Sequence, residues 1–73
     1  MTTRIAFDED LLRAIRLRGL TLQEVAARAG ISPATVSAAI HGRAVNMRTA
    51  LRLARAVSSC PVVPELEAWL AGP

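Results

Sequence analysis

Apolar residues recur at helical spacing in the segment TLQEVAARAGISPATVSAAIHG, residues 21–42, and predict two short helices joined by a tight turn. Thr21 and Glu24 have the spacing of a capping box at the start of the first helix. Gly30 can supply the left-handed residue that ends this helix. Its predicted buried face consists of Leu22, Val25, Ala26 and Ala29.

The second helix of this segment begins with Ser32 as a candidate cap, and Pro33 at its first position has no N–H to lose. Gly42 ends it. The small side chains of Ala26 and Ala29 allow the two helices to cross closely. Capped helix, glycine-containing turn and capped helix form a helix-turn-helix pattern. The buried face of the second helix is predicted to be Val36, Ala39 and Ile40.

Two further helices flank this segment. After a partly ordered lead, residues 1–6, Asp8 can cap a helix that ends at Gly19. It directs Leu11, Leu12 and Ile15 inward and Arg13, Arg16 and Arg18 outward. After a loop over residues 43–45, Asn46 can cap another helix. Its predicted core positions are Ala50, Leu53, Ala54 and Val57, and its exposed arginines are Arg48, Arg52 and Arg55.

A short terminal helix is predicted over residues 64–70, with Leu66, Trp69 and Leu70 on one face. The chain of 73 residues therefore predicts an all-α fold, a compact five-helix domain spanning residues 1–73, with no second domain. A hydrophobic content of 52% excludes a disordered chain.

All nine basic residues are arginine, and the net charge is +3. Such a charge favours a polyanionic partner, although it also serves simply to keep a small protein in solution. One cysteine, Cys60, and one histidine are too few for a zinc site, so we expect no metal and no cofactor. Cys60 is expected to be a buried or half-buried residue of a connector. No apolar stretch has the length of a signal core or a membrane span, which predicts a cytoplasmic, nucleoid-associated protein.

The block VAARAGISPATVS, residues 25–37, and the segment NMRTALRLARAV, residues 46–57, resemble the phage-repressor family (lambda repressor and Cro relatives, the Xre type). The first block also resembles lac-repressor-type proteins, but those begin with this motif, whereas a separate helix precedes it here. The resemblance covers roughly residues 11–70. It implies a lambda-repressor-like DNA-binding domain, with the second helix of the motif in the major groove of double-stranded DNA.

The recognition helix departs from the family pattern. In relatives the positions of Pro33, Ala34 and Ala38 carry base-reading side chains, but here they are small and apolar. We expect thymine-methyl contacts and single hydrogen bonds, with specificity from DNA shape or from Arg43 and Arg48 in the loops. The predicted DNA-binding residues are Thr21, Gln23, Ser32, Pro33, Ala34, Thr35, Ser37, Ala38, His41, Arg43 and Arg48.

Two of these positions have alternatives. Relatives carry a phosphate-binding Gln at the position of Leu22, so Thr21, Gln23 and the N-terminal N–H groups of that helix are the substitutes here. His41 either contacts DNA or is simply a residue favoured by the helix C-terminus.

The apolar residues Leu66, Trp69 and Leu70 either cover the core as a lid or pair two chains, and we favour dimerisation. The leading hypothesis is a small Cro-like or prophage-type repressor that binds a palindromic operator as a homodimer. The alternative is an antitoxin-like protein-binding module with secondary DNA binding. The sequence contains no pattern typical of an enzyme, so we expect no catalysis.

Overall fold

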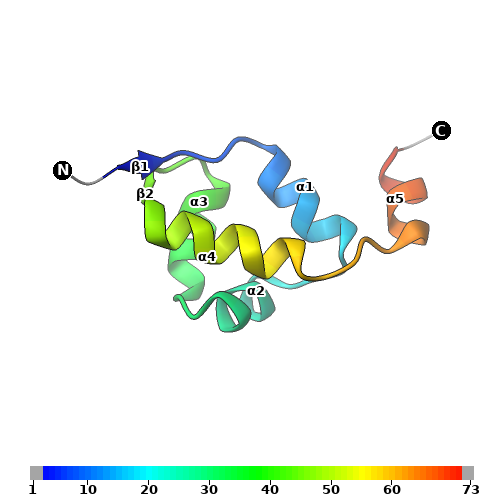
Figure 1. Ribbon diagram of the computed structural model, residues 1–73. Helices are drawn as coiled ribbons and strands as arrows, with labels where there is room; N and C mark the ends of the chain where they lie inside the picture. The colour runs from blue at the N-terminus through cyan, green and yellow to red at the C-terminus, as the bar shows by residue number, and fades with distance from the viewer. Residues whose placement is uncertain (1–2, 72–73) are drawn as a thin grey trace.

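The computed structural model describes residues 3–71 and contains five helices, as predicted. Helices α2 and α3 form the predicted helix-turn-helix and pack against each other, and α4 lies across α2 (Figure 1). The chain is elongated, with principal extents of 45 × 22 × 17 Å. The helices are α1 (Asp10–Leu17), α2 (Leu22–Ala29), α3 (Pro33–Ile40), α4 (Met47–Ser58) and α5 (Pro64–Ala71).

A short antiparallel sheet joins two segments that the sequence analysis took for a lead and a loop. Strand β1 (Arg4–Ile5) pairs with β2 (Val45–Asn46), with Ile5 opposite Val45. The Met47 N–H extends the pairing by donating to the Thr3 carbonyl at 3.0 Å. Strands of two residues are too short to show a periodic pattern, so they could not be predicted from the order of apolar residues. The expectation for residues 3–6 and for Val45 was therefore wrong, and the sheet anchors the start of α4.

The core is aliphatic and lies where α1, α2, α3 and α4 meet. Ile15, Val25, Val36 and Leu53 are its largest fully buried side chains. On α4 the prediction was wrong at one position: Ala54 is exposed, and Ala56 is buried instead. The buried stripe of α4 therefore turns slightly away from the expected one, which leaves Ala54 beside exposed residues.

Arg18 does not point into solvent as expected. Its guanidinium is half-buried, with Nε donating to the Cys60 carbonyl and Nη1 to the Ala14 carbonyl, both at 2.9 Å. The Val63 N–H also donates to the Leu17 carbonyl at 2.8 Å. These bonds fasten the connector that follows α4 to the end of α1. Cys60 is half-buried in that connector, as predicted.

Helix α5 lies at one end of the molecule and packs mainly against α1 (Figure 1). None of its residues is buried. Leu66 and Leu70 are half-buried, whereas Trp69 is 79% exposed. The three residues thus do not share one face equally, because the two leucines turn toward the body and the tryptophan turns away. No helix within residues 3–71 is long and apolar enough to cross a membrane.

Candidate nucleic-acid interface

The start of α2 is fixed by the predicted capping box. The Glu24 N–H donates to Thr21 Oγ1 at 3.1 Å, and the Thr21 N–H donates to Glu24 Oε1 at 3.0 Å. Because this backbone N–H stabilises the charged carboxylate, with help from the Thr21 side chain and the nearby positive charge of Arg28, the pKa of Glu24 is lowered. The capping box therefore favours the ionised form of Glu24.

The turn between α2 and α3 has the predicted chemistry. Gly30 adopts a left-handed conformation with φ 72°, and the Ile31 N–H donates to the Ala26 carbonyl at 3.0 Å. Ser32 then accepts the Thr35 N–H at 3.2 Å, and Pro33 occupies the first turn of α3. Both ends of the turn are thus held by local bonds, and the angle between the helices follows from them.

Five of the predicted DNA-contacting residues gather on the outward side of α3 and just beyond its end. They line one shallow hollow, which consists of Ala34, Ser37, Ala38, His41 and Arg43. Four of these come from α3 or its C-cap, and Arg43 follows the left-handed Gly42, with its N–H donating to the Ala38 carbonyl at 3.0 Å. Along the helix the hollow is lined by small, uncharged side chains, and at its end lies the guanidinium of Arg43. The small side chains allow a polar ligand to approach the helix closely, and the guanidinium can bind a phosphate.

His41 has a defined tautomer when it is neutral. Its Nδ1 lies 2.7 Å from the Ser37 carbonyl oxygen. A carbonyl can only accept, so Nδ1 carries the hydrogen and Nε2 presents a lone pair. The side chain is exposed, so Nε2 can accept a hydrogen bond from outside. The imidazole thus satisfies a carbonyl at the end of α3 through Nδ1, and this contact leaves Nε2 available to a partner outside the chain.

The N-terminus of α2 is partly occupied by an anion from the chain itself. The first N–H groups of a helix attract negative charge, but here the Glu24 carboxylate already accepts the Thr21 N–H. An incoming phosphate would meet the N–H groups of Leu22 and Gln23 beside that carboxylate. Both Thr21 and Gln23 are exposed. The Glu24 carboxylate thus places a negative charge beside the N–H groups that the sequence predicted for a phosphate.

The remaining predicted residues lie apart from the hollow. Ser32, Pro33 and Thr35 lie at the start of α3, where the Ser32 and Thr35 hydroxyls are 2.9 Å apart. Arg48 is exposed on α4 and lines a different hollow, with Met47 and Leu51. The structure therefore gathers Arg43 with α3 but does not gather Arg48 with it. No three His, Cys, Asp or Glu side chains within residues 3–71 are placed to hold a metal ion.

Sequence reasoning did not identify two features of this surface. The first is that the Glu24 carboxylate, predicted only as part of the cap, lies at the N-terminus that was predicted to hold a phosphate. The second is the tautomer of His41, because only the position of the Ser37 carbonyl defines it.

Comparison with known families gives one match, to a family described as Helix-turn-helix, over residues 12–59. The match spans all of α2, α3 and α4 and most of α1, and it ends before α5. No curated protein and no solved structure matches the chain.

Proposed function

Since the chain belongs to the phage-repressor (Xre) type of the helix-turn-helix family, and is thus a DNA-binding transcription regulator, we propose that it acts as a Cro-like or prophage-type repressor. Two copies bind a palindromic operator, each with α3 in the major groove. A two-fold dimer places the two recognition helices about 34 Å apart, one turn of DNA. The protein then acts on DNA in the cytoplasm, at the nucleoid.

The hollow along α3 is the observation that carries this proposal. Ala34 and Ala38 let the helix approach the base edges closely, and their methyl groups favour contact with thymine methyls. Neutral His41 accepts a hydrogen bond through Nε2, which suits the amino group of adenine or cytosine. Arg43 at the end of the hollow holds a phosphate or enters the minor groove. Sequence preference then comes from few base contacts together with DNA shape.

Dimerisation through α5 is supported by the exposure of Trp69, a residue that is 79% exposed. A large aromatic side chain that its own chain leaves uncovered is a typical anchor of an interface. Leu66 and Leu70 are half-buried against the body, so they hold α5 in place while Trp69 faces a second copy.

The proposal is tested by fluorescence anisotropy with a duplex taken from the DNA beside the protein's own gene, against a scrambled duplex, from about 50 to 200 mM salt. We expect preference for the first duplex and a steep loss of affinity with salt. Ala34→Glu places a carboxylate in the hollow and should abolish binding. Ala27→Glu on the exposed side of α2 is the matched control. Equal loss in both variants, or equal binding of both duplexes, would contradict sequence-specific binding through α3.

Thymine-methyl contact has its own test. Replacing each thymine of the bound duplex by uracil removes one methyl group and leaves the base pairing unchanged. We expect weaker binding at the positions that face Ala34 and Ala38. Unchanged affinity at every position would contradict the methyl contact, while the proposal of groove binding would stand.

A further inference from the structure

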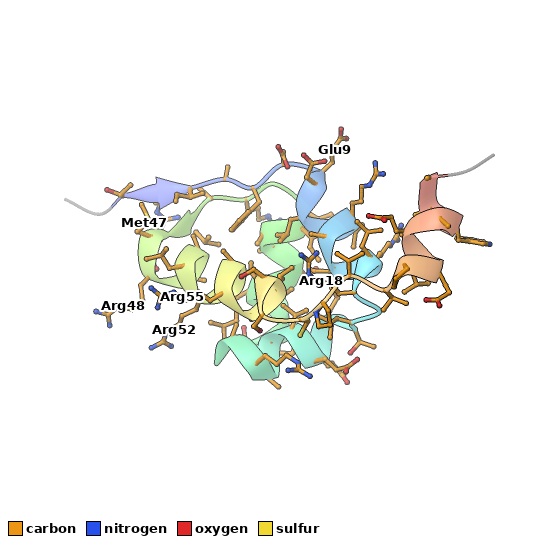
Figure 2. All side chains as sticks on the ribbon, turned by 45° about the vertical axis from the view of Figure 1, so that its right-hand side comes forward. Glu9, Arg18, Met47, Arg48, Arg52 and Arg55 are labelled. Carbon is orange, nitrogen blue, oxygen red and sulfur yellow. The ribbon has the colours of Figure 1, made fainter. Side chains whose placement is uncertain are left out.

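Helix α4 carries an exposed surface that neither the core nor the hollow along α3 uses. Two neighbouring stripes run along it at helical spacing. One is apolar and consists of Met47, Leu51 and Ala54, and the other is basic and consists of Arg48, Arg52 and Arg55. We call these six residues the α4 surface. Figure 2 shows the labelled arginines of α4 extending away from the body, unlike Arg18.

The apolar stripe is unusual for a small chain. Met47 is 40% exposed and Leu51 47% exposed, and with Trp69 they are the large hydrophobic residues exposed among those described. Ala54, predicted for the core, is exposed one turn further along. A small residue beside two large ones leaves room for another helix to approach closely. The apolar stripe therefore offers two large anchors and a small residue to a helix that packs along α4.

The basic stripe lacks a partner of opposite charge in the hollows that it lines. Arg52 and Arg55 border Met47 and Leu51 on one side. On the other side they line a cleft between α2 and α4 together with Arg28. No carboxylate lines either hollow. Arg52 reaches toward the turn after α2, because its Nη1 lies 3.8 Å from where a Cβ on Gly30 would be. The arginines thus offer a row of free donors to carboxylates.

The α4 surface is separate from the hollow along α3, because the two share no lining residue. DNA is the less suitable occupant. A phosphate backbone would satisfy the arginines but would leave Met47 and Leu51 uncovered. A second copy is the competing occupant, because its own carboxylates are exposed around the start of α1 and, as Glu65 and Glu67, on α5 beside Trp69. If a second copy occupied the α4 surface, Leu51→Asp would abolish self-association of the chain, and that result would contradict a helix of another protein as the occupant.

We propose that the α4 surface binds an acidic amphipathic helix of another protein. Apolar side chains of that helix pack on Met47 and Leu51 across Ala54, and its carboxylates pair with Arg52, Arg55 and Arg28. This is recognition of a helix in a groove, in which apolar anchors give affinity and charge sets orientation. The protein would then bind DNA through α3 and a protein partner through α4 at the same time.

The test uses the full chain, labelled with ¹⁵N, and a synthetic helical peptide of 16 residues that carries leucines along one face and glutamates beside them. A peptide of identical composition in scrambled order is the control for charge alone. We expect saturable shifts of the amide signals within residues 47–58, and binding at least about tenfold weaker for the scrambled peptide.

Two variants locate the binding energy. Leu51→Asp removes the apolar anchor and Arg52→Glu reverses a charge, and each should weaken peptide binding about tenfold or more. Ala27→Asp and Arg13→Glu make the same charge changes on exposed residues of α2 and α1. These controls should keep peptide affinity. Thermal unfolding confirms that every variant is folded, and the operator duplex is bound in parallel.

Four further results would overturn the proposal. If the scrambled peptide bound as tightly as the ordered one, binding would depend on charge alone and not on the apolar stripe. Amide shifts centred on residues 33–43 would show that the peptide binds at α3 instead of α4. The absence of any shift would show that the peptide does not bind. Loss of duplex binding in Leu51→Asp without loss of peptide binding would make the α4 surface part of the DNA interface. Failure of operator binding in the parent chain, with peptide binding intact, would contradict only the proposed function.

Discussion

Helices α2, α3 and α5 have the same length of eight residues, but the helix-turn-helix and α5 are held in place by different means. In α2 and α3 each helix start has a side-chain cap, and Val25 and Val36 are completely buried. In α5 no residue is buried, and its largest side chain faces solvent. The comparison teaches that the geometry of the recognition helix is set within one chain, whereas α5 keeps an apolar surface uncovered.

The largest expected change in stability comes from a substitution on the buried side of α3. Val36→Ala should lower the free energy of unfolding by about 2 kcal/mol, because it leaves a cavity at a site with no solvent exposure. Urea denaturation measures it. Val62→Ala, in the half-buried connector that leads to α5, is the matched control and should cost less than about 1 kcal/mol. Equal losses would mean that the two regions are equally well packed.

A smaller effect is expected at the start of α2. Thr21→Ala removes the acceptor for the Glu24 N–H and should cost about 1 kcal/mol of unfolding free energy. Thr21→Ser keeps a hydroxyl and should restore most of this loss. Thr3→Ala is an exposed control outside any cap and should change stability by less than about 0.5 kcal/mol. A loss in Thr21→Ser as large as in Thr21→Ala would point to the methyl group instead of the cap.

The capping box also predicts a dependence on pH. The pKa of Glu24 is lowered below its ordinary value of 4.5 in the folded chain, so its contribution to stability is present above pH 4.5 and is lost as the pH falls through the folded pKa. Glu24→Gln should therefore be less stable than the parent chain at pH 7, and the difference should shrink at about pH 3. Denaturation at both pH values measures it, with Glu9→Gln as control. A difference that stays constant would show that ionised Glu24 does not stabilise the fold.

The smallest effect on the isolated chain is expected at Trp69. Because its side chain is 79% exposed, Trp69→Ala should change the stability of a dilute sample by less than about 0.5 kcal/mol. At high concentration the parent chain should gain Tm through dimerisation, and the variant should not. Trp69 is the one tryptophan, so its fluorescence reports burial directly. A Tm independent of concentration in the parent chain would leave α5 without a role in self-association.

The same contrast explains what the sequence could predict. The caps at Thr21, Ser32 and Asn46 are local chemistry within three residues, and the structure contains all three. Asp8 also accepts the Asp10 N–H at 2.9 Å, although α1 begins one residue later than a cap at Asp8 implies. Signals of this kind need no knowledge of tertiary structure, which is why the five helices and their order were predictable.

What could not be predicted depends on contacts between distant residues. The pairing of Ile5 with Val45 and the bond from Arg18 to Cys60 each join segments about 40 residues apart, so no short pattern carries them. On α4, Ala54 and Ala56 are both alanine, and helical spacing alone did not decide which one faces the core. At the hollow along α3, the sequence supplied the residues, but only the fold showed that Arg43 joins them and Arg48 does not.

The bond between Arg18 and the Cys60 carbonyl has a consequence for measurement along DNA. It fixes the connector to α1, which shares the core with α3, so the bond ties α5 to the body that carries the recognition helix. In a dimer formed through Trp69, this bond lies between the dimer interface and each recognition helix. A rigid connection allows one distance between the two half-sites of the operator, and a flexible connection allows a range of distances. Arg18 would then determine how strictly the protein measures the length of its operator.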